Sequence, residues 1–262
     1  MTQRFSIASY SFHGLYRIGA MNAVQYFETI KYRYHVQYAD LWNLMLTSYD
    51  DGYLLMLRDQ LDERGLTLAN LCCDGAHPWE DKEDDRNRND ITADNCLRAA
   101  SILGALSVRM DVGIRTDNAT DEQIEYVARK FKAYSRYCAR FGAKFGPENH
   151  WGASRDIAVI RKLIQAVDEP NYAHLLHLGN WLTDSPDKAL DCDLAMAPAA
   201  MHIHMHYGAC TDADHIFPLL IKAGYQGVWS IESHLSDNEY NNVAYQLAQA
   251  KRVIAPYHYK EK

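Results

Sequence analysis

Residues 144–178 read KFGPENHWGASRDIAVIRKLIQAVDEPNYAHLLHL and contain a complete strand–helix–strand pattern. Two short apolar runs, Lys144–Glu148 and His174–Leu178, predict buried strands, and Arg155–Val167 between them predicts a helix. The apolar residues of this helix recur at the spacing of one helical face: Ile157, Ile160, Leu163 and Ile164. A helix between two buried strands is typical of a parallel βαβ unit.

The same alternation continues on both sides of this segment. Short apolar runs predict six more strands: Phe5–Ala8, Val36–Leu41, Thr67–Cys72, Leu106–Met110, Met201–Met205 and Val228–Ile231. Helical spacing marks Tyr53–Gly65, which ends at a glycine, and Asp121–Ala143, which begins with acidic residues and has a glycine near its end. The polar stretch Asp81–Asp90, DKEDDRNRND, predicts one conspicuous loop.

Eight strands alternating with helices in 262 residues favour an α/β fold, a (β/α)8 TIM barrel with a single domain over residues 1–262. The alternative is an open doubly wound sheet. That fold binds dinucleotides through a G-x-G-x-x-G turn after its first strand, and this chain has no such motif there. The closed barrel is therefore the prediction.

The composition excludes several classes of protein. Apolar residues make up 48% and charged residues 23%, as in an ordinary globular domain. No apolar stretch approaches the roughly eighteen residues of a membrane span, and MTQRFSIASYSF at the start has no long apolar core, so we expect a cytoplasmic protein without membrane contact. Six cysteines without C-x-x-C spacing predict free thiols. The net charge of -7 argues against a nucleic-acid partner and favours a small polar substrate.

Potential metal ligands end four successive predicted strands. The strand ends read Pro147-Glu148-Asn149-His150, His177-Leu178-Gly179-Asn180, His202-Ile203-His204-Met205-His206 and Ile231-Glu232-Ser233-His234. Functional residues of this fold lie at the carboxyl ends of the strands. Acids and imidazoles that end buried runs need an ion pair, water or a metal, and one metal satisfies several of them together.

Alternation in the seventh strand places His202, His204 and His206 on one face, with His206 entering the following loop. A lone histidine is more often a hydrogen-bonded core or surface residue than a ligand, but four strand ends together favour a metal site. The roles of Asn149, His150, His174 and His234 stay open between lining the pocket, supporting a ligand and capping a helix.

With these motifs the chain resembles the xylose isomerase-like sugar phosphate isomerase and epimerase superfamily, nearly from end to end. Its most specific motif is P-E-N-H-W-G at residues 147–152. Further matching pieces are Y-A-D-L-W-N at 38–43, D-G-A-H-P-W at 74–79 and V-R-M-D at 108–111.

The resemblance implies one divalent metal ion held by Glu148, His177, His204 and Glu232. His177 departs from the pattern, because the family has an aspartate at the corresponding position. Two glutamates and two histidines form a mixed nitrogen and oxygen site that suits manganese, our first choice, or zinc, cobalt or iron better than magnesium.

The resemblance also implies a sugar, keto-sugar or related polyol as substrate, with removal of a proton next to a carbonyl. Glu148, His150 and Glu232 are the candidate catalytic residues, and His150 is favoured as the base at a pKa near neutrality. Two further departures are His206, where the family commonly has a lysine, and Ser154, where the ketose 3-epimerases have a second catalytic glutamate. A mechanism with two glutamates is therefore not expected.

Four residues are candidates for binding substrate oxygens: His77, Arg109, Asn180 and His206. For Arg109 the alternative is a structural ion pair with Asp111. The tryptophans at positions 79, 151 and 181 offer flat faces for sugar stacking, although packing alone also explains them.

Four functions stay open. The first two are a sugar isomerase or epimerase and a lyase acting on a keto-sugar or keto-glycoside, towards which Ser154 tilts the choice. The third is a DNA-repair type nuclease, which the acidic balance disfavours. The fourth is a non-catalytic or partner-dependent carbohydrate-binding subunit. By analogy with the family, a homodimer is expected.

Overall fold

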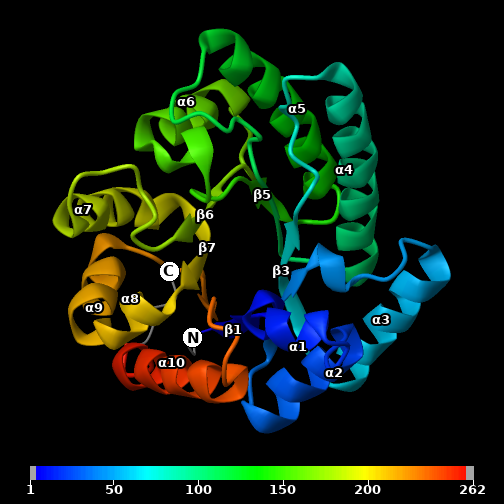
Figure 1. Cartoon of the computed structure of the whole chain (residues 1–262), viewed down its shortest axis with the longest axis vertical. Helices are drawn as coiled ribbons and strands as arrows, with labels where there is room; N and C mark the ends of the chain where they lie inside the picture. Colours follow the sequence, from blue (N-terminus) through cyan, green and yellow to red (C-terminus); the bar gives the residue numbers. More distant parts are fainter. Residues whose placement is uncertain (1–3, 258–262) are drawn as a thin grey trace.

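Eight parallel strands form the centre of the molecule, and helices surround them (Figure 1). The computed structural model describes residues 4–257, so both ends of the predicted 1–262 domain lie outside the described residues. The strands are β1 Phe5–Ala8, β2 Tyr38–Trp42, β3 Thr67–Cys73, β4 Ser107–Met110, β5 Lys144–Gly146, β6 His174–His177, β7 Ala200–Met205 and β8 Val228–Ile231.

The strands follow the order β5-β4-β3-β2-β1-β8-β7-β6, and each strand pairs in parallel with its neighbours in that order. Isolated bridges from Phe145 to Tyr172 and from Glu148 to Leu175 join β5 to β6 and close the ring. The predicted (β/α)8 TIM barrel with a single domain is therefore confirmed.

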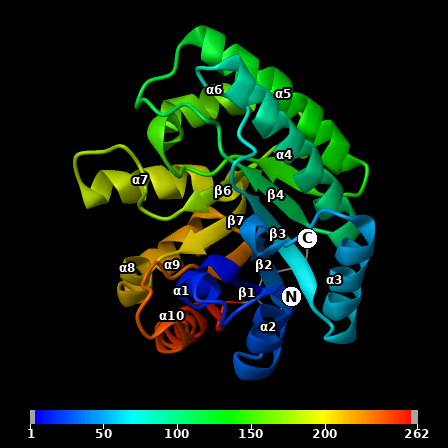
Figure 2. The ribbon, with the colours of Figure 1, turned by 45° about the vertical axis from the view of Figure 1, so that its right-hand side comes forward.

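Helices follow the strands and form the outer layer, as the turned view in Figure 2 shows. The longer ones are α3 Asp51–Glu63, α4 Glu83–Leu103, α5 Asp121–Ala139, α6 Ile157–Val167, α7 Pro186–Met196, α9 Ala213–Ala223 and α10 Glu239–Ile254. Three are short: α1 His13–Arg17, α2 Ala23–Glu28 and α8 Tyr207–Thr211. Short 3-10 or π turns span Ser9–Phe12, Thr29–Arg33, Asn43–Met45, Gly152–Arg155 and Ala197–Ala199.

The predicted strands all exist, with ends displaced by up to two residues. The predicted loop Asp81–Asp90 is wrong, because α4 begins at Glu83 and contains most of that stretch. Its first turn carries Glu83, Asp84 and Asp85, and acids there interact favourably with the helix dipole. The polar residues face solvent, and the buried side of α4 begins at Ala93. A helix start therefore explains the charged run.

The end of β5 positions part of the site. Pro147 has no N–H for a strand ladder, and β5 ends just before it, at Gly146. Beyond the strand, the side chain of Asn149 takes the place of backbone pairing with β6. Its Nδ2 donates to the His177 carbonyl at 2.8 Å, and its Oδ1 accepts from the His177 N–H at 2.7 Å. This pairing holds Glu148 next to His177.

Among the described residues no helix is both long and apolar enough to cross a lipid bilayer. All six cysteines are free thiols, as the sequence predicts.

Candidate metal centre and active site

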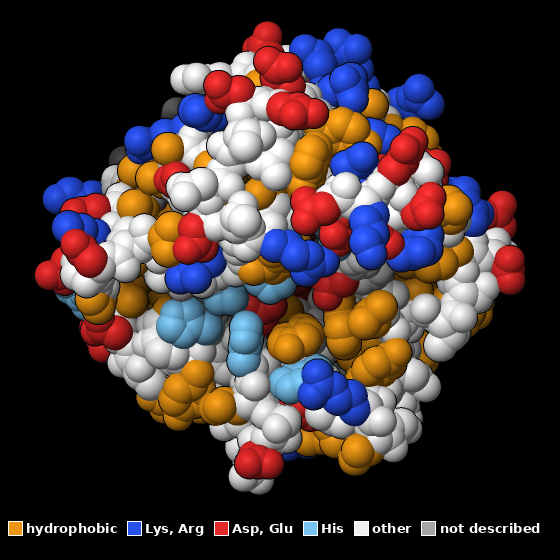
Figure 3. All heavy atoms as spheres, turned by 45° about the horizontal axis from the view of Figure 1, so that its top comes forward, with side chains coloured by type: hydrophobic (Ala, Val, Ile, Leu, Met, Phe, Trp, Pro, Cys, Tyr) orange, Lys and Arg blue, Asp and Glu red, His pale blue; other side chains and the backbone are white. Residues whose placement is uncertain are grey.

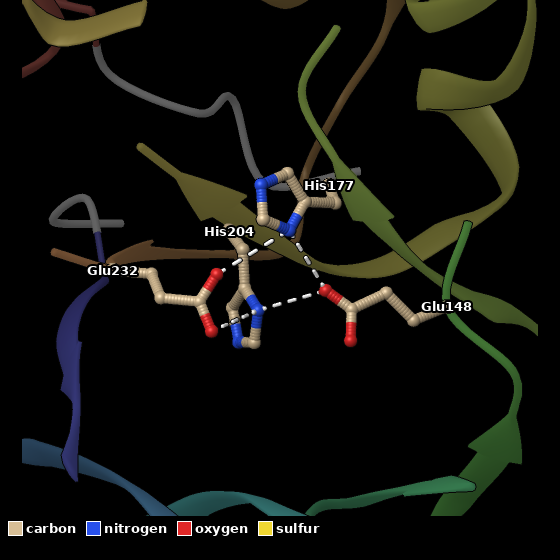
Figure 4. Close-up of side chains that lie close together, drawn as sticks. All are labelled: Glu148, His177, His204 and Glu232. Carbon is tan, nitrogen blue, oxygen red and sulfur yellow. Dashed lines mark hydrogen bonds and ion pairs between the residues drawn. The ribbon is translucent and has the colours of Figure 1, made fainter. Parts of the chain in front are cut away.

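Glu148, His177, His204 and Glu232 meet at the carboxyl ends of β5 to β8, although the first and last are 84 positions apart in the chain (Figure 4). His177 ends β6 and His204 lies within β7, while the two glutamates come just after β5 and β8. All four side chains are buried. The structure thus brings together the four ligands that the resemblance implies.

The four residues alternate in a ring of histidine and glutamate. Glu148 Oε1 lies 3.1 Å from Nδ1 of His177 and 3.1 Å from Nδ1 of His204. The oxygens of Glu232 lie 3.3 Å from Nδ1 of His177 and 3.2 Å from Nδ1 of His204. Adjacent ligands of one ion bound at about 2.1 Å lie about 3.0–3.4 Å apart, so the donor set fits one divalent cation.

Positive charges within and beside the ring hold its carboxylates ionised. Burial by itself would raise the pKa of Glu148, but Arg109 and His204 outweigh it and keep that pKa well below the usual range. Burial by itself would lower the pKa of His204, but Glu232, Glu148 and Asp40 raise it well above the usual value. The two ionised carboxylates therefore need positive charge beside them. A bound cation would supply it in place of the protons on the histidines.

Asp40 in β2 contacts the second imidazole nitrogen of His204 and so orients this side chain. Its Oδ2 lies 2.9 Å from Nε2 of His204 and 2.9 Å from Nε2 of His202, and it accepts from Ser230 Oγ at 2.8 Å. Asp40, His202 and His204 are buried inside the barrel. A carboxylate on the second nitrogen of a ligating histidine fixes the ring and leaves the other nitrogen for the metal, here Nδ1.

A cavity of about 230 Å³ opens beside the ring at the mouth of the barrel. It is lined by Ala8, Ser9, Tyr10, Asp40, Trp42, Cys72, Asp74, Arg109, His150, Glu232 and His234. Figure 3 shows histidine side chains gathered around a hollow on this face, with acidic side chains visible in it. Outside it lies an open groove of about 560 Å³, which shares His150 and His234 with the cavity.

His150 lines the cavity and forms a pair with Asp111. Its Nδ1 lies 3.2 Å from Asp111 Oδ2, so Nε2 is the nitrogen left for a substrate. Burial would lower the pKa of His150, but Glu148 and Asp111 raise it to about 9. This differs from the predicted value near neutrality, because the sequence did not reveal that two carboxylates flank the ring.

Arg109 lies between the ring and the cavity and is paired with three carboxylates. Its Nη1 is 2.8 Å from Asp74 and 3.2 Å from Asp111, and its Nε is 3.0 Å from Glu148 Oε2. That glutamate oxygen makes no hydrogen bond to another group among the described residues. Arg109 therefore forms the ion pair with Asp111 and also lines the cavity, while its binding of substrate oxygens stays a prediction.

The remaining predicted substrate-binding residues lie outside this cavity. His77 binds Glu80 at 2.6 Å and packs its ring edge against Trp151, and it lines neither the cavity nor the groove. Asn180 donates to the carbonyls of Asn149 and His150 at 2.7 Å, so it holds the loop after β5 and borders the groove.

His206 also borders the groove, stacks on His177 and caps α8, as Gly208 N–H donates to its Nδ1 at 3.0 Å. Burial lowers the pKa of His206 to about 4, so its ring is neutral at physiological pH. Ser154 is buried, and its hydroxyl is bonded to Trp151 and His150 within their loop, away from the cavity.

Sequence reasoning did not place Asp40 and Asp74 in the site, and it considered Asp111 only as a structural partner of Arg109. Asp40, Asp74 and Asp111 lie within or just after β2, β3 and β4. Each belongs to a motif that supported the resemblance, and the strand-end rule applied to β2–β4 would have found them. His234, which the sequence left open, lies in the cavity with Nε2 at 3.1 Å from Glu232.

The fold and the buried ring define a TIM barrel with a candidate divalent-cation site at its mouth. A family model described as xylose isomerase-like TIM barrel matches residues 27–255. The chain therefore belongs to the family of xylose isomerase-like TIM barrels, and the resemblance is confirmed. A comparison with curated protein sequences finds no significant match.

Solved structures share the whole barrel at low identity. The apo 3-keto-D-glucoside 4-epimerase YcjR from E. coli is 16% identical with a TM-score of 0.71, over 96% of this chain and 99% of that one. A zinc-bound IolI protein is 13% identical with a TM-score of 0.74, over 98% and 99%. A D-psicose 3-epimerase crystallised with D-fructose is 12% identical with a TM-score of 0.69, over 97% of both chains. At these identities the likeness concerns the fold.

Proposed function

We propose that this protein is a divalent-metal-dependent enzyme that acts on a sugar, keto-sugar or related polyol by removing a proton next to a carbonyl. The observation that carries the proposal is the ring of two glutamates and two histidines with donor separations of 3.1–3.3 Å, open to a cavity that contains the His150–Asp111 pair. The sugar-directed names of two similar structures support the substrate class.

Glu148, His177, His204 and Glu232 would hold the ion, with manganese as our first choice and zinc, cobalt or iron as alternatives. The bound ion would polarise the substrate carbonyl and stabilise the negative charge that proton removal creates. Burial of the ring excludes water from these charges and so strengthens their interactions.

His150 exchanges the proton with the substrate in this proposal. Asp111 engages Nδ1 and fixes the ring, so Nε2 is the atom that takes or returns the proton. Trp151 donates from Nε1 to the same Asp111 at 3.1 Å and holds the carboxylate in place. Replacing His150 with alanine should therefore lower kcat/KM by about 10²–10⁴-fold while leaving metal content unchanged.

The size of the cavity supports a small substrate, since sites for drug-sized ligands are about 300–1,000 Å³ and this one is about 230 Å³. A lyase acting on a keto-glycoside is the second candidate, because the adjoining groove of about 560 Å³ offers room for a departing substituent. An isomerase or epimerase yields a product of unchanged mass, whereas a lyase yields two products or an unsaturated sugar. Mass spectrometry of the products separates the two reactions.

Elemental analysis of purified protein tests the metal site. We expect about one transition-metal ion per chain in the wild type and its loss in His204→Ala and Glu232→Gln. Loss in His177→Ala as well would identify His177 as a ligand, while retention there would make it a bystander. A wild type that takes up neither manganese nor zinc would refute the proposal.

A non-catalytic or partner-dependent carbohydrate-binding subunit is the competing function. It predicts that Glu232→Gln and wild type behave alike in every keto-sugar assay, with sugar binding retained in both. A homo-oligomer stays a prediction from the family, and the mass of the protein in solution by light scattering tests it.

A further inference from the structure

We infer that the site accepts uncharged sugars and excludes sugar phosphates and sugar acids, and that Asp74 sets this selectivity by neutralising Arg109. The inference rests on the proposed function, since it concerns the substrate of the same site. It goes further in assigning a substrate class and a role to an aspartate outside the candidate metal ring.

Arg109 is the only lysine or arginine among the described residues that line the cavity. Arginine is the usual partner of a phosphate or carboxylate group, which it binds with two parallel N–H bonds. Here Nη1 and Nε face Asp74, Asp111 and Glu148 at 2.8, 3.2 and 3.0 Å. The side chain of Arg109 is 5% exposed, and these carboxylates already compensate its charge before a substrate arrives.

With neutral histidines, the balance of charge around the cavity is negative even with a cation present. A divalent ion and Arg109 would supply three positive charges. Five carboxylates face them, from Asp40, Asp74, Asp111, Glu148 and Glu232. His150 and His234 also line the cavity, so a proton on either one leaves an excess of one negative charge, and protons on both balance the five carboxylates. In a buried site such an excess repels an anionic ligand strongly, because charges interact more strongly there than in water.

The described residues along the approach to the cavity include no lysine or arginine that would offset this negative charge. The outer groove is bordered by four histidines and by no lysine or arginine among the described residues. Beyond His206 lies another open cavity of about 580 Å³ between α7 and α9, and its described lining carries four aspartates and again no lysine or arginine. A phosphate or carboxylate substituent therefore meets no lysine or arginine among the described residues along this path.

Asp74 is the carboxylate that can change without dismantling the site. Glu148 belongs to the metal ring and Asp111 holds His150, whereas the side chain of Asp74 binds Arg109 and accepts from Trp42 Nε1 at 2.7 Å. It lies at the cavity surface with 36% of its side chain exposed. Asp74→Asn keeps the shape, removes one negative charge and leaves Arg109 undercompensated.

The experiment compares binding of D-fructose and D-fructose 6-phosphate to metal-loaded protein by calorimetry. Wild type should bind the phosphate ester at least tenfold more weakly than the free ketose, and Asp74→Asn should reduce that ratio at least tenfold. The control is Asp90→Asn, which makes the same charge change at 31% side-chain exposure on α4, where the aspartate pairs with Lys130. It should leave the ratio unchanged.

Equal or tighter binding of the phosphate ester by wild type would overturn the inference and leave the proposed function standing. An unchanged ratio in Asp74→Asn would overturn the role of Asp74. If wild type retains its metal but binds neither ketose, the sugar-directed function itself fails, and the inference fails with it.

Discussion

Replacing Asp40 with asparagine should weaken metal binding without touching a ligand. Asp40 Oδ2 gathers Nε2 of His204, Nε2 of His202 and the hydroxyl of Ser230 within 2.9 Å, and Oδ1 accepts from Asn70 at 2.9 Å. An amide offers one acceptor atom in place of two, so its NH2 group must face a donor on one side.

Two effects set the size of the change. Losing the anionic partner of a ligating histidine typically costs about 10–100-fold in metal affinity, or about 1.4–2.7 kcal/mol. Removing one charge from a buried paired network also lowers the free energy of unfolding by about 3–5 kcal/mol. Because Asp40 is fully inside the barrel, neither effect is reduced by solvent.

Competition with a chelating dye measures the affinity for zinc and manganese, and urea unfolding of the metal-free protein measures stability. Ser230→Ala is the control, since it removes one donor to the same oxygen and leaves the contact with His204 intact. Its metal affinity should stay within about threefold of wild type. A folded Asp40→Asn protein with wild-type metal affinity would refute the reasoning that Asp40 orients His204.

Three further predictions concern stability. Burial raises the pKa of Asp193 from 3.8 to about 7, so as pH rises the carboxyl ionises in the unfolded chain before it ionises in the folded protein. Between about pH 4 and 7, wild type should therefore lose up to about 4 kcal/mol of unfolding free energy relative to Asp193→Asn. Urea titrations across this pH range measure the difference. Burial lowers the pKa of His174 from 6.5 to about 4, so stability is lost as pH falls and not as it rises. Between about pH 6.5 and 4, wild type should lose about 3 kcal/mol of unfolding free energy relative to His174→Leu. The same pH dependence of stability in both proteins would contradict this. In Gly146→Ala the new Cβ would lie 1.6 Å from the carbonyl oxygen of Ala173, so Tm should fall by the equivalent of about 1–3 kcal/mol or more, unlike Gly52→Ala, where no atom lies within 4 Å.

The barrel was predictable because each of its parts has a local cause. Short apolar runs correspond to strands buried on both faces, and the predicted stripe of α6 packs on the core, with Ile160 and Leu163 buried and Ile157 and Ile164 partly buried. The run Asp81–Asp90 misled because composition alone does not distinguish a solvated loop from the exposed start of a helix. Its acids stabilise the first turn of α4, which only the placement of Ala93 against the core reveals.

The candidate ligands were predictable because the strand-end rule and a family motif converge on β5 to β8. The residues that orient them were not, because their pairing depends on closure of the barrel. Asp40 contacts His204 across 164 positions of sequence, and no local pattern encodes that distance. The pKa of His150 was missed for the same reason, since Asp111 reaches it from the neighbouring strand.

Histidine at position 177, where the family has an aspartate, changes the charge of the four-residue metal site but keeps the arrangement of its side chains. His177 Nδ1 lies 3.1 Å from Glu148 and 3.3 Å from Glu232, nearly the same separations as those of His204, so the two imidazoles face the two carboxylates in equivalent ways. A neutral imidazole in place of an aspartate lowers the negative charge around a cation, and Arg109 lowers it further by pairing with Glu148. Nitrogen donors and reduced charge both disfavour magnesium, which prefers oxygen ligands, and this is why we propose manganese, zinc, cobalt or iron for the centre.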